Sequence, residues 1–159
     1  WNPCTRSQLI SYSQRKLQLL EFGEEKKLSR ELNSLKSWDT QHILSLDWRP
    51  CVEDPVVAYG TSSGSVHLLN VSSGDEISVS QGFRLGKRCC NAVAWNKHMP
   101  SQLLAGFDSL KSEFCAIVWD FEHEHFLQAS FGEPACSLSW LPDNAHSLAV
   151  GTNMGWVKV

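Results

Sequence analysis

The sequence predicts an all-β protein made of about four antiparallel β-sheets, of which the first and the last are incomplete. Tryptophan recurs at positions 1, 48, 95 and 140, which are 47, 47 and 45 residues apart. Residues 91–121 contain three short apolar runs, which end in Trp95, Gly106 and Trp119-Asp120. Polar or turn-forming residues follow each of the four tryptophans, and in three cases a proline two positions further on ends the strand.

This repeat indicates a segment of a WD-repeat β-propeller. A propeller is a ring of four-stranded antiparallel sheets called blades, and a blade of this class repeats every ~40–45 residues, more with insertions. The Trp-Asp pair at 119–120 stands where this motif closes the third strand of a blade. We expect blades at approximately 1–40, 41–88, 89–133 and 134–159. The expected structural blade markers are Trp48, Gly60, Trp95, Gly106, Trp119, Asp120, Trp140 and Gly151.

The first blade is predicted to be a hairpin followed by an insertion. Residues 8–12 and 16–22 alternate as strands joined by a short turn, while the strand before them lacks its beginning. In the stretch 24–38, three leucines fall at the spacing of one helical face, namely Leu28, Leu32 and Leu35. We favour a solvated inter-strand insertion that contains a short fourth strand. A partner-binding helix is the alternative.

The remaining blades follow one strand pattern. The second run of the second blade is apolar at consecutive positions, which predicts burial on both faces, as in stacked blades. The third blade has a longer connection at 108–113 between its second and third strands. The expected strands are 43–48, 56–60, 66–71 and 76–79 in the second blade, 91–96, 102–108 and 114–121 in the third, and 136–140, 148–151 and 156–159 in the fourth.

Composition excludes several classes of protein. Charged residues make up 19% and apolar residues 42% of the 159 residues, which is typical of a globular chain. The formal net charge is −3 and no run of Lys and Arg occurs, so we expect no nucleic-acid partner. The apolar runs are too short to span a bilayer, so we expect no direct membrane insertion. Because the chain opens at Trp1, we expect a piece of a longer protein.

No catalytic, cofactor or metal site is predicted. None of the six cysteines forms a Cys-x-x-Cys pair, so we expect reduced structural thiols and a cytosolic compartment. The densest group of ligand-type residues is 122–125, which directly follows Asp120. On a strand, His123 and His125 would share a face and could bind one metal ion. We favour a solvated connection, since no third ligand is evident from the sequence.

A narrower resemblance rests on the third and fourth blades. In order and spacing, their segments resemble the Mio (missing oocyte) WD-repeat family: 90–96 (CNAVAWN), 103–108 (LLAGFD), 114 (F), 117–120 (IVWD) and 135–142 (ACSLSWLP). The match covers roughly half of the chain, and the first two blades fit by pattern alone. Lys97 stands where the family tends to carry proline, so a close paralogue of the same assembly remains an alternative.

The resemblance implies a non-catalytic protein-interaction scaffold. Mio-like proteins are subunits of the SEA/GATOR nutrient-sensing complex, in which an N-terminal propeller precedes a helical solenoid and a zinc-binding region. The implied partners are other protein subunits. The implied location is the cytoplasm, at the lysosomal surface, where the complex promotes amino-acid-dependent TOR signalling. The alternatives are a WD-repeat scaffold of another assembly and a metal-dependent enzyme that uses His123 and His125.

Overall fold

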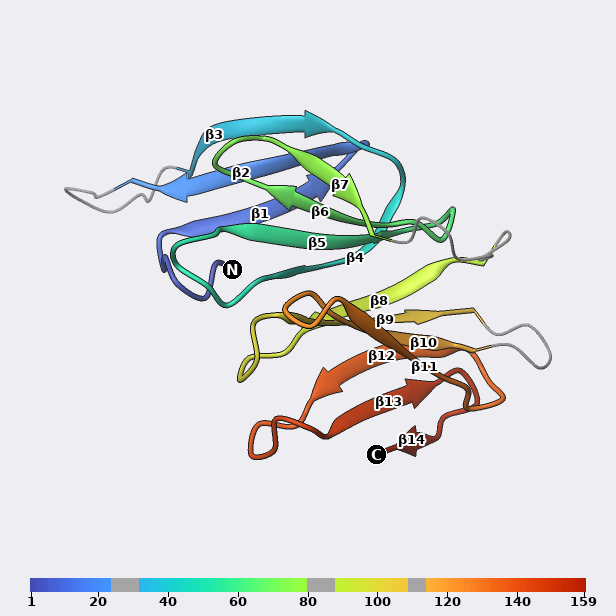
Figure 1. Ribbon diagram of the computed structural model, residues 1–159. Helices are drawn as coiled ribbons and strands as arrows, with labels where there is room; N and C mark the ends of the chain where they lie inside the picture. The colour runs from blue at the N-terminus through green and yellow to red at the C-terminus, as the bar shows by residue number, and fades with distance from the viewer. Residues whose placement is uncertain (24–31, 80–87, 109–113) are drawn as a thin grey trace.

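The structure is a computed structural model that describes residues 1–23, 32–79, 88–108 and 114–159. Within these residues the chain forms strands β1 to β14 and no helix, so the all-β fold class is confirmed. None of the described residues forms a helix that is long and apolar enough to cross a membrane. The strands make four antiparallel sheets, which follow one another from the N-terminal sheet at the top of Figure 1 to the C-terminal sheet at the bottom.

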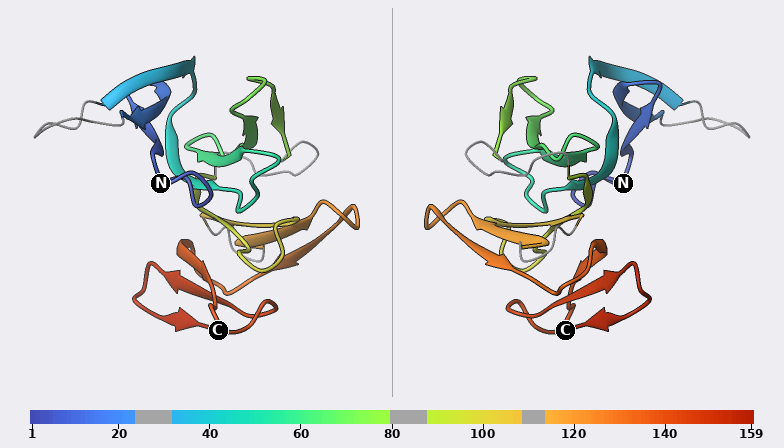
Figure 2. Two further views of the ribbon diagram at one scale, coloured as in Figure 1. Left: turned by 90° about the vertical axis from the view of Figure 1, so that its left-hand side faces the viewer. Right: turned by 90° about the vertical axis from the view of Figure 1, so that its right-hand side faces the viewer.

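The sheets contain three, four, four and three strands, in the order in which the chain visits them. The turned views in Figure 2 show the sheets arranged around an arc, as the blades of a propeller are. The exact blade boundaries stay a prediction from the sequence. The sheets are β1 (Gln8–Ser13), β2 (Lys16–Phe22), β3 (Leu32–Asp39); β4 (Ile43–Trp48), β5 (Val56–Thr61), β6 (Val66–Asn70), β7 (Glu76–Ser78); β8 (Cys90–Trp95), β9 (Gln102–Phe107), β10 (Ala116–Asp120), β11 (His125–Ala129); and β12 (Ala135–Trp140), β13 (Leu148–Thr152), β14 (Val157–Lys158).

The alternative prediction of a helix at 24–38 is wrong for residues 32–38, which the structure describes. Residues 32–39 form the strand β3, which pairs antiparallel with β2 along its whole length. Leu32 and Leu35 are both 46% exposed, so their helical spacing marks no buried face. Backbone hydrogen bonds to the neighbouring strand decide the conformation here, and Leu28 lies outside the described residues.

One backbone hydrogen bond recurs after each of the four spaced tryptophans. The residue after each tryptophan donates its N–H to the carbonyl of a residue at, or just before, the start of the next strand. The four bonds are Asn2 to Gln8 (3.0 Å), Arg49 to Val56 (2.8 Å), Asn96 to Gln102 (2.9 Å) and Leu141 to Ser147 (2.9 Å). The four tryptophans therefore occupy equivalent backbone positions in successive blades, although Trp1 lies outside a strand and its side chain is 69% exposed.

The inner strands β4, β8 and β12 lie next to one another, and each contains an irregularity at the same point. The register shifts between Ile43 and Ser45, between Cys90 and Ala92, and between Ala135 and Ser137, which is the position of a β-bulge. The residue after each shift pairs with one of the marker glycines: Gly60, Gly106 or Gly151.

Two of these glycines allow successive blades to approach closely. A Cβ atom on Gly60 would lie 2.4 Å from Cys90 Sγ and 3.0 Å from the Cys90 carbonyl oxygen, in the next blade. A Cβ atom on Gly106 would lie 2.9 Å from the Cβ of Ala135, again in the next blade. Cys90 is fully buried, and burial raises the pKa of its thiol to about 12. The thiol therefore stays protonated and packs as a small apolar group.

Two apolar clusters fill the spaces between the first three blades. The cluster between blades one and two includes Leu17, Trp48 and Tyr59. The cluster between blades two and three includes Trp95 and Phe107. These side chains come from facing sheets and are almost wholly buried, so packing between blades forms the core.

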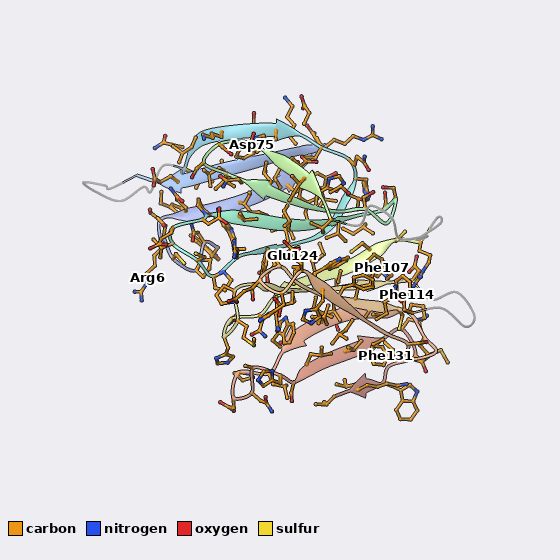
Figure 3. The ribbon with its side chains drawn as sticks, in the orientation of Figure 1. Arg6, Asp75, Phe107, Phe114, Glu124 and Phe131 are labelled. Carbon is orange, nitrogen blue, oxygen red and sulfur yellow. The ribbon has the colours of Figure 1, made fainter. Side chains whose placement is uncertain are left out.

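Arg88 is a buried charged residue at the edge of blade three. Only 2% of it is exposed. Its guanidinium donates to the carbonyl of Asp108 (2.5 Å) and to the carbonyl of Phe114. It also lies over the rings of Phe107 and Phe114, with Cζ 5.8 Å and 4.8 Å from the ring centroids, and Figure 3 labels both phenylalanines. Arg88 thus links the two chain segments that flank residues 109–113.

Candidate functional site

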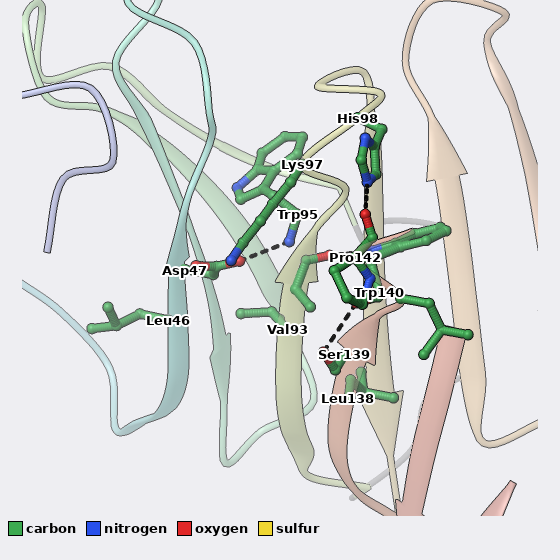
Figure 4. Close-up of a pocket in the computed structure, with 12 residues that line it drawn as sticks. Leu46, Asp47, Val93, Trp95, Lys97, His98, Leu138, Ser139, Trp140 and Pro142 are labelled. Carbon is green, nitrogen blue, oxygen red and sulfur yellow. Dashed lines mark hydrogen bonds between the residues drawn. The ribbon is translucent and has the colours of Figure 1, made fainter. Parts of the chain in front are cut away.

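A groove with a volume of about 480 Å³ lies at the carboxyl ends of the inner strands of blades two, three and four (Figure 4). Its floor contains apolar side chains from each of the three strands. Lys97, His98, Ser139 and Pro142 are exposed at its rim. The groove therefore combines an apolar floor with a polar rim, which is a usual form for a binding site.

Asp47 links two blades at one wall of the groove. Its carboxylate accepts the backbone N–H of Trp48 (3.0 Å) and the backbone N–H of Trp95 (2.8 Å) in the next blade. Burial raises the pKa of Asp47, whereas these two hydrogen bonds and nearby positive charge lower it. Figure 4 shows the Lys97 side chain extending toward this carboxylate.

The opposite wall is tied between blades three and four. The indole of Trp140 donates to the carbonyl of Ala94 (3.0 Å), and the amide of Asn96 donates to the carbonyl of Ala145 (2.8 Å). A ring nitrogen of His98 lies 2.7 Å from the carbonyl oxygen of Pro142. The Ser139 hydroxyl donates to the carbonyl of Trp140, not to an imidazole. These polar groups brace the groove, and the arrangement suits recognition better than acid–base catalysis.

The structure places the marker residues in two ways. Trp48, Trp95 and Trp140 end the inner strands, and Trp95 and Trp140 line the groove, while the three marker glycines lie in the second strands. Trp119 and Asp120 end β10, on the third strand of blade three. The tryptophan spacing thus located two of the residues that line the groove. The convergence of Lys97, Ser139 and Pro142 was not predicted, because these residues come together only when blades pack.

A second group of side chains lies at the turn between β10 and β11. Asp120 and His125 face each other in the register of the two strands, and His123 lies in the turn between them. Ligand atoms of these three residues lie within 4.8 Å of one another. The predicted solvated connection is therefore followed directly by a further strand of the same sheet. The strand β11, which the sequence analysis missed, brings His125 back to Asp120.

Comparison with known proteins gives one matching family. A family model described as eukaryotic translation initiation factor eIF2A matches residues 4–155. The match covers nearly the whole chain and includes strands β1 to β13.

Two curated relatives confirm the resemblance to the Mio family. The chain is 29% identical to the GATOR2 complex protein MIOS of Dictyostelium discoideum, in a match that covers 87% of this chain and 17% of that protein. It is 25% identical to the GATOR2 complex protein MIOS-A of Xenopus laevis, over 72% of this chain and 13% of that protein. The chain thus spans less than a fifth of the length of these relatives.

A solved structure with a similar fold is the β-propeller domain of Cps50 (Swd1) from Myceliophteria thermophila. The TM-score is 0.57 and the sequence identity is 16%, over 74% of this chain and 35% of that chain. At this identity the likeness supports the fold alone. The expected WD-repeat β-propeller segment is confirmed.

Proposed function

The chain belongs to the family described as eukaryotic translation initiation factor eIF2A, and we propose that its blades act as a non-catalytic protein-interaction scaffold in a GATOR2-type complex. Both MIOS relatives are named as proteins of the GATOR2 complex, and each match covers more than two thirds of this chain. A rigid stack of blades that presents variable loops suits such a role.

The groove at the ends of β4, β8 and β12 is the observation that carries this proposal. Its walls are braced by hydrogen bonds between blades, so the rim side chains project from a rigid frame. A rigid frame lowers the ordering cost of binding. The apolar floor and the polar rim fit an extended segment of another protein subunit.

The resemblance to the Mio family also suggests a cellular role for this scaffold. In this role the scaffold promotes amino-acid-dependent TOR signalling and lies in the cytoplasm, at the lysosomal surface, through its complex. Its partners are protein subunits. The net charge of −3 and the absence of a Lys/Arg run argue against nucleic acid as a partner.

The test is a double variant of the groove rim, Lys97→Gln with Ser139→Arg, in the full-length protein. Both residues are exposed, so the fold should tolerate the change. We expect the GATOR2 subunits that copurify with it to fall at least tenfold, at an unchanged melting temperature. Lys16→Glu, an exposed site on blade one, is the matched control. Undiminished copurification of the rim variant, or an equal loss with Lys16→Glu, would refute the groove as the contact surface.

A second candidate function comes from the family description, which names a translation initiation factor. Sedimentation of cell extracts through a sucrose gradient separates the two candidates. A scaffold of the GATOR2 type should migrate with the subunits of that complex. Comigration with ribosomal particles that persists after a wash at moderate salt would favour the translation role instead.

A further inference from the structure

The turn between β10 and β11 gathers two imidazoles around a buried carboxylate. Four residues, 121–124, separate the facing pair Asp120 and His125. Glu124, labelled in Figure 3, has a φ of 52°, so the chain reverses sharply at this point. As a result, Asp120, His123 and His125 form the one group among the described residues whose His, Cys, Asp or Glu ligand atoms cluster as a metal ion requires.

The carboxylate of this group is already in a fixed position. Asp120 is 4% exposed, and one of its oxygens accepts the backbone N–H groups of Glu122 (3.1 Å) and His123 (3.3 Å). The other oxygen accepts the side-chain amide of Gln102 (3.0 Å). The hydrogen bond from Gln102, followed by those from His123 and Glu122, holds the pKa of Asp120 well below its ordinary value, so the group is anionic at neutral pH.

Blade two contains the same turn without histidines. There Asn70 accepts the backbone N–H groups of Ser72 (2.9 Å) and Ser73 (3.1 Å), and Gly74 takes the left-handed conformation with a φ of 86°. A side-chain oxygen at the first position is therefore enough to form the turn. The two histidines of blade three are therefore not required to form the turn. Their position around Asp120 calls for another explanation.

We propose that Asp120, His123 and His125 form a binding site for a divalent transition-metal ion, with zinc as the best fit. Two imidazole nitrogens and one carboxylate oxygen are a ligand set that zinc accepts, and water would fill the remaining positions. Zinc binds such ligands at about 2.0–2.2 Å, so two ligand atoms on a tetrahedral ion lie roughly 3.3 Å apart. Asp120 Oδ2 and His123 Nδ1 are already 3.1 Å apart.

The third ligand can reach the ion by rotation of its side chain. The rings of His123 and His125 have centroids 5.9 Å apart, and both residues are exposed, which leaves their side-chain torsions free to adjust. The ion would take the place of the hydrogen bond between the Nδ1 atom of His123 and the Oδ2 atom of Asp120. Because the site faces solvent, we expect a dissociation constant in the micromolar range.

The test is calorimetric titration of the purified full-length protein with zinc chloride, with wild type, His123→Ser and His125→Gln compared. We expect a micromolar binding event in the wild type, separate from any zinc held elsewhere in the full-length protein, that each variant weakens at least tenfold. Titration with cobalt(II) gives a second readout, since a four- or five-coordinate site produces visible d–d absorption, and both variants should lack the share of it that this site contributes.

The controls separate metal binding from folding. His123→Ser places the blade-two residue in the turn, so the circular dichroism melting curve should stay unchanged. His146→Gln removes an exposed histidine far along the chain and should leave the titration unaffected. The proposal is overturned if the wild type shows no micromolar event, if the two turn variants bind as the wild type does, or if His146→Gln weakens binding equally.

Discussion

The contact between blades two and three and the contact between blades three and four use the same backbone frame but opposite side-chain chemistry. Between blades two and three, Ser45 and Asp47 of β4 accept backbone N–H groups of β8. Between blades three and four, side chains donate instead: Asn91 to the carbonyl of Ala135, and Trp140 to the carbonyl of Ala94. The repeat therefore preserves the backbone geometry of the contact, and either an acceptor or a donor side chain can complete it.

The two contacts also differ in burial. Trp95 is 3% exposed and belongs to the apolar cluster between blades two and three, whereas Trp140 is half-buried beside the groove. Equivalent positions in a repeat can thus carry different shares of the stability. This difference can be tested by paired substitutions at matching sites.

The largest effect is expected for Trp95→Ala. Removal of this buried indole should lower the free energy of unfolding by ~3–5 kcal/mol, because it leaves a cavity that the neighbouring blades cannot close. Trp140→Ala should cost about 1–2 kcal/mol, since much of that side chain already contacts solvent. Denaturant unfolding monitored by fluorescence and circular dichroism measures both. The exposed site Lys16→Ala should stay within about ±0.5 kcal/mol, and equal losses at Trp95 and Trp140 would contradict the difference in burial.

The next effect concerns the close approach of successive blades. Gly60→Ala should lower the free energy of unfolding by about 1–3 kcal/mol, because its new methyl group would meet both the sulfur and the backbone oxygen of Cys90. Gly151→Ala should cost less than about 1 kcal/mol, since its nearest neighbour is the hydroxyl of the exposed Ser137, which can rotate away. The same denaturant curves compare them.

A double variant sharpens the comparison at Gly60. Cys90→Ala removes the sulfur contact but leaves the backbone oxygen 3.0 Å from the added methyl group. Gly60→Ala combined with Cys90→Ala should therefore recover only part of the loss. Full recovery would show that the backbone of blade three can move, and no loss in the single variant would disprove the close approach.

The smallest effect is a dependence on pH that differs in sign between two carboxylates. The pKa of Asp120 lies below the ordinary value of 3.8, so its stabilisation is present above pH 3.8 and is lost as the pH falls toward the lowered pKa. The pKa of Asp47 is raised, so its contribution to stability increases as the pH falls from that raised pKa to 3.8. An NMR titration that follows the carboxyl carbons should resolve the two groups. A titration midpoint for Asp120 above that for Asp47 would contradict the predicted directions of the two pKa shifts.

Much of the blade pattern could be predicted from the sequence because the relevant signals are local. The spacing of Trp48, Trp95 and Trp140 and the glycines in the second strands follow directly from strand length and turn placement. The strand β11 was not predicted, and β3 was expected only as a short strand within an insertion, for one physical reason. Every residue of β11 is exposed, and Leu32 and Leu35 of β3 are exposed as well, so outer strands lack the alternation that marks a half-buried strand.

The candidate sites were less predictable, since they depend on contacts between segments. His123 and His125 were recognisable as ligand types from their spacing. Asp120 could be added as a third ligand only once the register of β10 and β11 was known, because that register sets it opposite His125. The groove needed the packing of three blades, which no single stretch of sequence describes.

Arg88 fixes the two residues Asp108 and Phe114 to blade three. Because the guanidinium binds the carbonyls of both flanking residues, the distance between these two anchor points is set by the blade and not by the length of the intervening chain. This makes the connection a suitable place for grafting foreign sequence, such as an epitope tag or a fluorescent-protein domain.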